Sequence, residues 1–111
     1  MSQIEYADFD RVEMRVGRIL SAEPLQGARK PAYKLSVDFG EMGTRWSSAQ
    51  VTALYQAEEL VGRLVVAVTN FPPKRIAGFM SEVLVLGAPN ERGEVVLLTP
   101  THDVPLGGRI F

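Results

Sequence analysis

Two apolar runs joined by a stiff connection constrain this chain more than any other feature of its sequence. Leu64–Val68 and Val83–Leu86 consist only of Leu, Val and Ala, which is typical of strands buried on both faces. The connection between them, residues 70–82, holds two consecutive prolines. Each proline fixes φ near about −65° and removes a backbone donor, so the connection cannot extend the ladder of the first strand. The sequence therefore predicts two buried strands with a rigid loop between them.

The same connection carries two adjacent cations and a glycine. Lys74 and Arg75 follow the prolines, and Gly78 is free to adopt a backbone conformation that a β-carbon would forbid. A rigid loop that presents two positive charges is suited to holding an anion. The alternative is an ordinary strand connection with solvated charges, and position alone does not decide between the two.

Length and composition indicate one domain, residues 1–111, since 111 residues is close to the common domain size of roughly 100–150. The absence of cysteine excludes disulfides and thiolate metal sites and fits a reducing cytosol. The first residues lack the features of a signal peptide, and no apolar run approaches the ~18 residues that span a bilayer. We therefore expect a soluble, cytoplasmic protein without membrane insertion.

Charge limits how this chain could bind a nucleic acid. Its net charge is −1 and its pI about 5.8, whereas a strongly basic domain is the usual footprint of such binding. Any nucleic-acid site must then be a local patch. The cations do cluster, with Arg29, Lys30 and Lys34 in one region and Lys74 and Arg75 in another.

Three segments in the first half of the chain alternate between apolar and polar residues, as half-buried strands do. These segments are residues 12–20, 34–39 and 44–50. In the second segment, Leu35, Val37 and Phe39 face the core, and a turn joins it to the third in a hairpin. Gly17, inside the first segment, predicts a bulge or sharp bend.

Helical signals are short. Residues 52–60 could present one apolar side, with Gly62 as a stop, and residues 6–11 could form one turn capped by Asp8. A further strand is expected at residues 94–98. Short strands with dense Gly and Pro punctuation predict an all-β barrel or sandwich.

No catalytic constellation is visible in the sequence. His102 is the single histidine and stands in a polar loop beside Asp103, where a solvated residue is the favoured interpretation over a base oriented by that carboxylate. Motifs of serine hydrolases, phosphate-binding glycine loops and metal sites are absent. We expect no enzyme activity, no catalytic or metal-ligating residues and no cofactor.

Five stretches resemble the motifs of the tRNA-binding domain family, which includes C-terminal domains of methionyl-tRNA synthetases and small stand-alone dimers. They are residues 8–19, 28–35, 47–50, 70–82 and 104–110, in the order of that family. The resemblance implies a five-stranded OB-fold Greek-key barrel with short helices and additional C-terminal strands. It also implies tRNA as a partner and a homodimer. Residues 26–31 resemble the stand-alone bacterial branch, described as secretion-related chaperones, rather than the synthetase domains.

The resemblance and the residue types together predict an RNA-binding site. Its candidates are Arg29, Lys30, Tyr33, Lys34, Ser48, Gln50, Asn70, Lys74, Arg75 and Ser81. Tyr33 lies beside cations, as a residue that stacks a base would, while Ser48 and Gln50 share one strand face. Asn70 either binds RNA or satisfies backbone groups of its own loop. Trp46 is either core or a stacking platform, and we expect core.

The chaperone alternative predicts a different surface that binds unfolded hydrophobic export precursors. Its candidates are Phe71, Ile76, Phe79 and Met80, because an apolar loop with a methionine adapts to many partners. Packing within a dimer would explain the same residues. The expected dimer interface itself comprises Ile4, Tyr6, Phe9, Leu106, Ile110 and Phe111.

Overall fold

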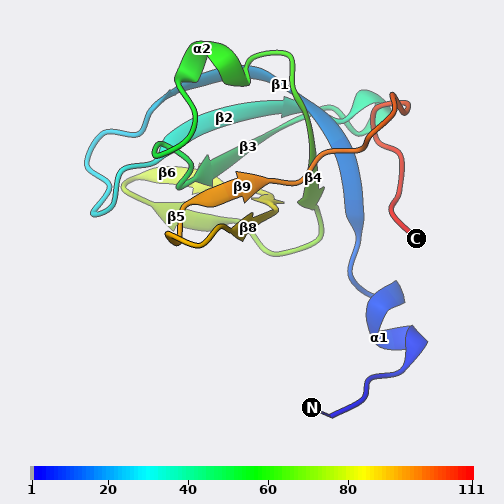
Figure 1. Ribbon diagram of the computed structural model, residues 1–111. Helices are drawn as coiled ribbons and strands as arrows, with labels where there is room; N and C mark the ends of the chain where they lie inside the picture. The colour runs from blue at the N-terminus through cyan, green and yellow to red at the C-terminus, as the bar shows by residue number, and fades with distance from the viewer. Residues whose placement is uncertain (1) are drawn as a thin grey trace.

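Five antiparallel strands form the body of the molecule in the computed structural model, which describes residues 2–111 (Figure 1). They are β1 (Met14–Pro24), β2 (Tyr33–Asp38), β3 (Thr44–Ala49), β4 (Leu64–Val68) and β7 (Leu84–Val85). Their spatial order is β3-β2-β1-β4-β7. The two end strands approach each other, because the backbone N–H groups of Glu82 and Val83 donate to the carbonyl of Trp46 at 2.8 and 3.3 Å. The sheet is therefore a nearly closed barrel, and the expected OB fold is confirmed.

The core fills the inner face of this barrel. Leu35, Val37 and Phe39 are all 0% exposed, as their alternation predicts. Gly17 is needed for close packing, since a β-carbon there would lie 2.5 Å from Val37 Cγ1 and 2.8 Å from the ring of Phe39. The bulge expected at Gly17 is instead found further along β1, where the pairing with β2 shifts between Ile19 and Ser21.

The helices are shorter than the sequence suggests. In α1 (Tyr6–Asp10), which projects from the barrel in Figure 1, Glu5 is the cap. Asp8 stands three residues later and accepts a hydrogen bond from the Glu5 N–H at 3.0 Å, so the assignment of Asp8 as the cap is wrong. A 3-10 turn, η1 (Gly40–Met42), joins β2 to β3. Of the expected helix 52–60, only α2 (Ala57–Leu60) forms, and its buried Leu60 joins the core. No helix within residues 2–111 has the length and apolar character to cross a membrane.

Residues 70–82 form a β-hairpin where a loop was expected. Strands β5 (Lys74–Ile76) and β6 (Phe79–Ser81) pair with each other as a separate two-stranded sheet. Their two-residue turn places Ala77 at φ 51° and Gly78 at φ 77°, positive at both positions as in type I′ hairpins. The left-handed conformation expected of Gly78 is thus confirmed, and the rigid loop expected between the two strands contains a β-hairpin over residues 74–81.

The C-terminal third adds a second small hairpin. Strands β8 (Gly87–Pro89) and β9 (Val95–Leu97) pair with each other, so the additional C-terminal strands are confirmed. The strand expected at residues 83–87 is reduced to the two residues of β7. It is not buried on both faces, because Leu84 is 48% exposed and only Val83 lies in the core.

Candidate nucleic-acid interface

Two elements, the loop 25–32 and the β5–β6 hairpin, border the outer face of β2 and β3. The face belongs to β2 and β3, the second and third strands of the barrel. The loop 25–32 joins β1 to β2, and the β5–β6 hairpin lies in the connection between β4 and β7, the fourth and fifth barrel strands. In OB folds this combination of strand face and loops forms the ligand groove. The two flanking elements lie close together, since a β-carbon on Gly27 would stand 3.9 Å from the Ala77 β-carbon.

Strand β3 shows which side chains reach this face. Ser47 and Ala49 are buried, while Trp46 and Ser48, which alternate with them along the strand, point outward. Trp46 is 38% exposed, so its expected place in the core is wrong. Ser48 lies opposite Lys34 of β2 in the strand register, and both candidates are therefore on the predicted face.

An aromatic contact connects the hairpin to this face. The rings of Trp46 and Phe79 meet edge to face, with centroids 5.9 Å apart and an interplanar angle of 88°. Lys34 Nζ lies 5.8 Å from the centroid of each ring. The same ammonium forms an ion pair with Glu23 of β1 at 3.3 Å. The surface position of Trp46 is the alternative to the expected core position, and Glu23 is not among the predicted residues.

The remaining cationic candidates lie on the two flanks of the face. Arg29 and Lys30 are exposed in the loop 25–32, and Lys74 and Arg75 are exposed on β5. Within residues 2–111 none of these four side chains takes part in an ion pair. Adjacent strand residues point to opposite sides, so Lys74 shares its side of the hairpin with Ser81, its register partner.

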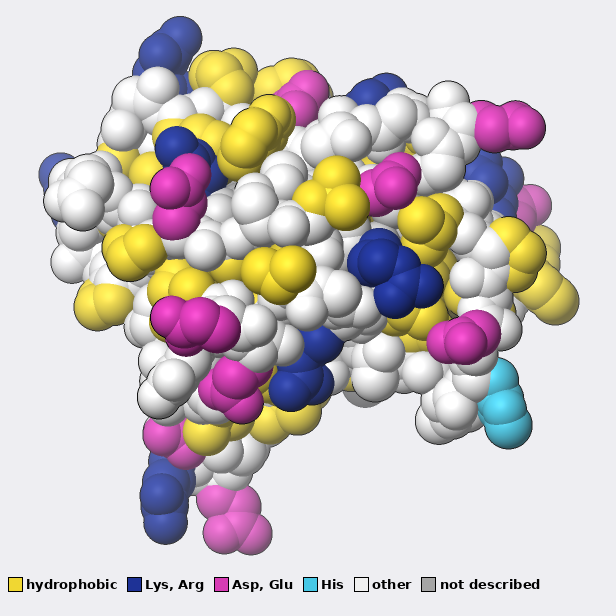
Figure 2. Space-filling model, turned by 90° about the horizontal axis from the view of Figure 1, so that it is seen from above, with side chains coloured by type: hydrophobic (Ala, Val, Ile, Leu, Met, Phe, Trp, Pro, Cys, Tyr) yellow, Lys and Arg dark blue, Asp and Glu magenta, His cyan; other side chains and the backbone are white. Residues whose placement is uncertain are grey.

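Charge elsewhere is mixed. On the face seen in Figure 2, Lys and Arg side chains stand singly between acidic and hydrophobic ones, with no continuous basic field. Among residues 2–111, no three His, Asp or Glu side chains come close enough together to hold a metal ion.

Ser81 and Glu82 close the free edge of β3. The Ser48 N–H donates to Ser81 Oγ at 3.0 Å, and the Trp46 N–H donates to Glu82 Oε1 at 3.0 Å. These side chains occupy positions that a neighbouring strand would otherwise fill with carbonyl groups. The hydroxyl of Ser81 also donates to the Val83 carbonyl at 3.4 Å, so the structure gives this RNA-binding candidate a role in barrel closure.

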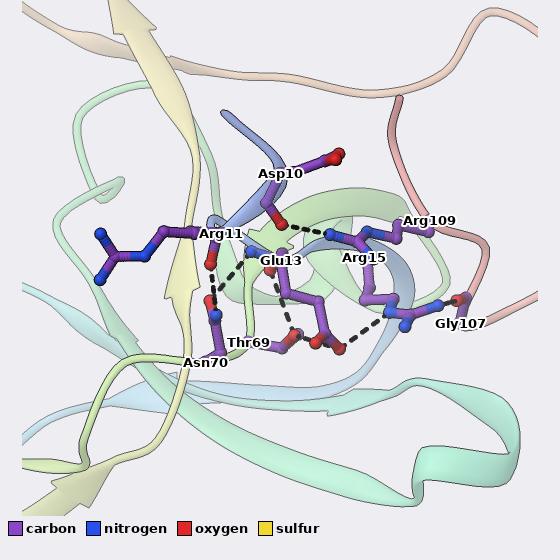
Figure 3. Close-up of polar contacts among 8 residues, drawn as sticks. All are labelled: Asp10, Arg11, Glu13, Arg15, Thr69, Asn70, Gly107 and Arg109. Carbon is purple, nitrogen blue, oxygen red and sulfur yellow. Dashed lines mark hydrogen bonds and ion pairs between the residues drawn. The ribbon is translucent and has the colours of Figure 1, made fainter. Parts of the chain in front are cut away.

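Asn70 and Tyr33 are engaged within the protein. Asn70 Oδ1 accepts a hydrogen bond from the Glu13 N–H at 2.9 Å, and Asn70 Nδ2 donates to the Arg11 carbonyl at 2.7 Å (Figure 3). Its partners are thus in the N-terminal segment rather than in its own loop.

Tyr33 packs against the core and donates its hydroxyl to the Tyr55 carbonyl at 2.8 Å. Base stacking on Tyr33 stays a prediction, but its ring belongs to the inner side of β2.

A polar network ties both terminal segments to the barrel (Figure 3). Arg15 Nε donates to Glu13 Oε1 at 3.0 Å, and Arg15 Nη1 donates to the Gly107 carbonyl at 3.0 Å. Arg109 Nη2 donates to the Asp10 carbonyl at 2.7 Å. The pKa of Glu13 is lowered, chiefly by the hydrogen bond from Arg15, which outweighs the opposing effect of partial burial.

The four peptide-binding candidates do not form one patch. Phe71 and Ile76 line an open cavity of about 620 Å³ that also reaches Ser48, Gln50 and Leu84. Phe79 lines a separate cavity of about 490 Å³. Met80 pairs with Arg75 in the hairpin register, on the other side from Ile76 and Phe79, and is 40% exposed.

The barrel and its bordered strand face are those of an OB-fold protein, a class in which this face and its loops bind oligonucleotides or oligosaccharides. Residues 14–109 match the family described as putative tRNA binding domain, and the chain belongs to that family.

Two solved structures of CsaA chaperones are similar to this chain over nearly its whole length. The protein from Bacillus anthracis str. Ames is 49% identical with a TM-score of 0.93, covering 99% of this chain and 100% of that one. The protein from Picrophilus torridus is 48% identical with a TM-score of 0.91, covering 98% and 100%.

A methionine–tRNA ligase from Methanosarcina acetivorans is 36% identical over 110 residues. The match covers 99% of this chain but 15% of the ligase. The chain therefore spans about one seventh of the length of that enzyme.

Proposed function

We propose that this protein binds tRNA without catalysing a reaction, as a homodimer in the cytoplasm. The observation that carries the proposal is the arrangement of unpaired cations on both flanks of the OB-fold groove. Arg29 and Lys30 stand on the loop 25–32, and Lys74 and Arg75 on β5. Membership of the tRNA-binding family supports the choice of ligand.

Recognition on this surface depends on shape more than on sequence. Cationic side chains contact phosphates, which carry no base identity, and few side chains on the groove can read base edges. Several tRNAs should therefore compete within a few-fold of one another, and an unstructured RNA of equal length should compete poorly. Tight binding of a single isoacceptor would contradict this expectation.

The homodimer is supported by exposed apolar side chains on both terminal segments. Ile4, Tyr6 and Phe111 are 73%, 70% and 101% exposed, and the network around Glu13 and Arg15 attaches these segments to the barrel. A two-fold axis would bury these side chains and pair two weak charge patches. Sedimentation at micromolar concentration should show twice the chain mass of 12.2 kDa; a lone monomer would contradict the dimer.

Charge reversal on β5 tests the RNA site. The double variant Lys74→Glu/Arg75→Glu should abolish tRNA binding in a filter assay and leave the thermal melt unchanged, since both side chains are exposed. Arg75→Glu and Arg92→Glu give the same net charge, and Arg92 lies in the turn between β8 and β9. Only the former should weaken binding. Wild-type affinity for the double variant would show that the hairpin is not the RNA site.

One observation favours peptide binding as a second candidate, in line with the printed names of the CsaA chaperones. The cavity of about 620 Å³ has apolar walls from Phe71, Ile76 and Leu84 and borders Ser48 and Gln50 at the end of β3. The β3 edge beside this cavity is already closed, because Glu82 and Ser81 accept hydrogen bonds from the N–H groups of Trp46 and Ser48. An extended hydrophobic peptide would therefore bind through apolar contacts with Phe71, Ile76 and Leu84 rather than as an added strand.

Salt dependence and one variant separate the two candidates. RNA affinity should fall by about 0.7–0.9 log units per tenfold increase in salt for each phosphate contact, whereas apolar peptide binding should hardly change. Phe71→Ser should weaken an extended hydrophobic peptide, while Val61→Ser should not, although the two side chains are 53% and 52% exposed. Equal peptide affinities for both variants would exclude this cavity.

A further inference from the structure

Trp46 is the single tryptophan of the chain and stands on the outer face of β3, 38% exposed. Resting on the proposed RNA-binding function, we propose that Trp46, Phe79 and Lys34 form a binding site for one unpaired nucleotide. Its base would stack on the aromatic pair, and its phosphate would bind Lys34. The flanking cations contact phosphates, which paired and unpaired RNA share. Stacking on the aromatic pair would add a preference for an unpaired nucleotide.

The aromatic geometry leaves a stacking surface. Trp46 and Phe79 meet nearly at right angles, 88°, so one ring uses its edge against the face of the other. Trp46 is 38% exposed and Phe79 is partly exposed, so both residues keep surface that a third planar group can reach. Unpaired bases stack on aromatic side chains of single-strand binding proteins, and the aromatic pair here lies on the strand face that OB folds use for such ligands.

Lys34 supplies the charge that a nucleotide requires. Its ammonium lies 5.8 Å from both ring centroids, so a phosphate bound there would be next to a stacked base. Lys34 is now paired with Glu23 at 3.3 Å, with side-chain exposures of 33% and 59%. Exposed ion pairs contribute little stability, so a phosphate can replace the carboxylate at small cost.

Space for the nucleotide adjoins Lys34 and Phe79. The cavity of about 490 Å³ lies between the end of β1 and the tip of the hairpin, and its walls include Lys34, Phe79, Gln26 and Gly78. Ligand pockets of about 300–1,000 Å³ accept molecules of nucleotide size. The amide of Gln26 offers both a donor and an acceptor to a base edge.

The single tryptophan provides the test, because intrinsic indole fluorescence reports Trp46 alone. Titration of the wild-type protein with a single-stranded adenine hexanucleotide should quench this fluorescence to saturation, at higher concentrations than tRNA because the hexanucleotide makes fewer phosphate contacts. tRNA should quench it with the same midpoint as in a filter assay. Trp46→Ala should weaken the hexanucleotide by roughly 5–150-fold, the loss of one stacked base. Trp46→Phe should retain most of the affinity.

Lys34→Gln should lower the salt slope of hexanucleotide binding by about one phosphate contact. Filter-bound tRNA without any fluorescence change, together with wild-type affinity in Trp46→Phe and Trp46→Ala, would overturn the nucleotide site and leave the proposed function standing. Failure to bind any RNA would overturn both. Quenching by an aromatic peptide but not by RNA would assign the aromatic pair to polypeptide instead. A circular dichroism melt confirms that each variant is folded.

Discussion

Phe39, just after β2, and Phe79, at the start of β6, are two phenylalanines in opposite surroundings. Phe39 is 0% exposed and its ring lies where a β-carbon on Gly17 would clash, at 2.8 Å. Phe79 is half-buried, touches Trp46 edge to face and lines an open cavity. The barrel uses its apolar side chains to fill space, whereas the hairpin keeps several of its own at the surface.

Polar side chains show the reverse distribution. Along β2 and β3 most polar side chains point outward, although Ser47 is 0% exposed, whereas at the hairpin Ser81 and Glu82 bind backbone groups of β3 at 3.0 Å. The hairpin is thus attached largely through directed hydrogen bonds and one aromatic contact. Its cations Lys74 and Arg75 and the apolar Met80 lie exposed at the surface, which is what the proposed binding element on a rigid scaffold requires.

The largest effect should come from comparing the two phenylalanines. Phe39→Ala should lower the free energy of unfolding by about 3–5 kcal/mol, the range for a buried ring. Phe79→Ala should lower it by about 1 kcal/mol, because the ring is only partly removed from water. Urea denaturation at one protein concentration measures both, which matters if the protein dimerises. Equal losses would show that the hairpin is part of the core.

Much of the barrel could be predicted from alternation. Leu35, Val37 and Phe39 face the core as their spacing indicates. The same alternation predicts the outward position of Trp46, which lies two residues before Ser48 and shares its outward face. We expected Trp46 in the core because of its residue type, and the strand period proved the better guide.

The hairpin could not be predicted in the same way. Its turn is Ala77-Gly78, not the Asn-Gly or Asp-Gly pair that signals a two-residue turn, and the preceding prolines predict a rigid loop rather than strands. The bond from the Trp46 N–H to Glu82 joins residues 36 positions apart. Local patterns carry no information on such a contact, so Glu82 was not among the predicted residues.

A smaller effect should follow from removing the polar attachment. Ser81→Ala and Glu82→Ala should each lower the free energy of unfolding by about 0.5–1.5 kcal/mol, the net contribution of one hydrogen bond. Amide hydrogen exchange should locate the loss. The Ser48 amide should exchange faster in Ser81→Ala, and the Trp46 amide in Glu82→Ala.

Glu91→Ala serves as the control for this pair, because Glu91 is an exposed carboxylate in the turn between β8 and β9. It should change neither amide. If both amides kept wild-type protection in the first two variants, the hairpin would be held by its apolar contacts instead, and the contrast with the barrel would disappear.

The smallest effect concerns pH and the network that attaches the terminal segments. The pKa of Glu13 is lowered, mainly by the hydrogen bond from Arg15. Its contribution to stability is therefore complete above the unfolded pKa of about 4.3 and is lost as pH falls through the lower folded pKa.

The stability difference between wild type and Glu13→Gln should be small, because the Arg15 and Glu13 side chains are 26% and 30% exposed. This difference should shrink between pH 7 and pH 3. The destabilisation by Phe39→Ala should stay constant over that range, since no carboxylate or imidazole among residues 2–111 belongs to its core cluster. Urea midpoints of the three proteins measure this, and a Glu13→Gln difference that persisted at pH 3 would show that the carboxylate acts through packing rather than charge.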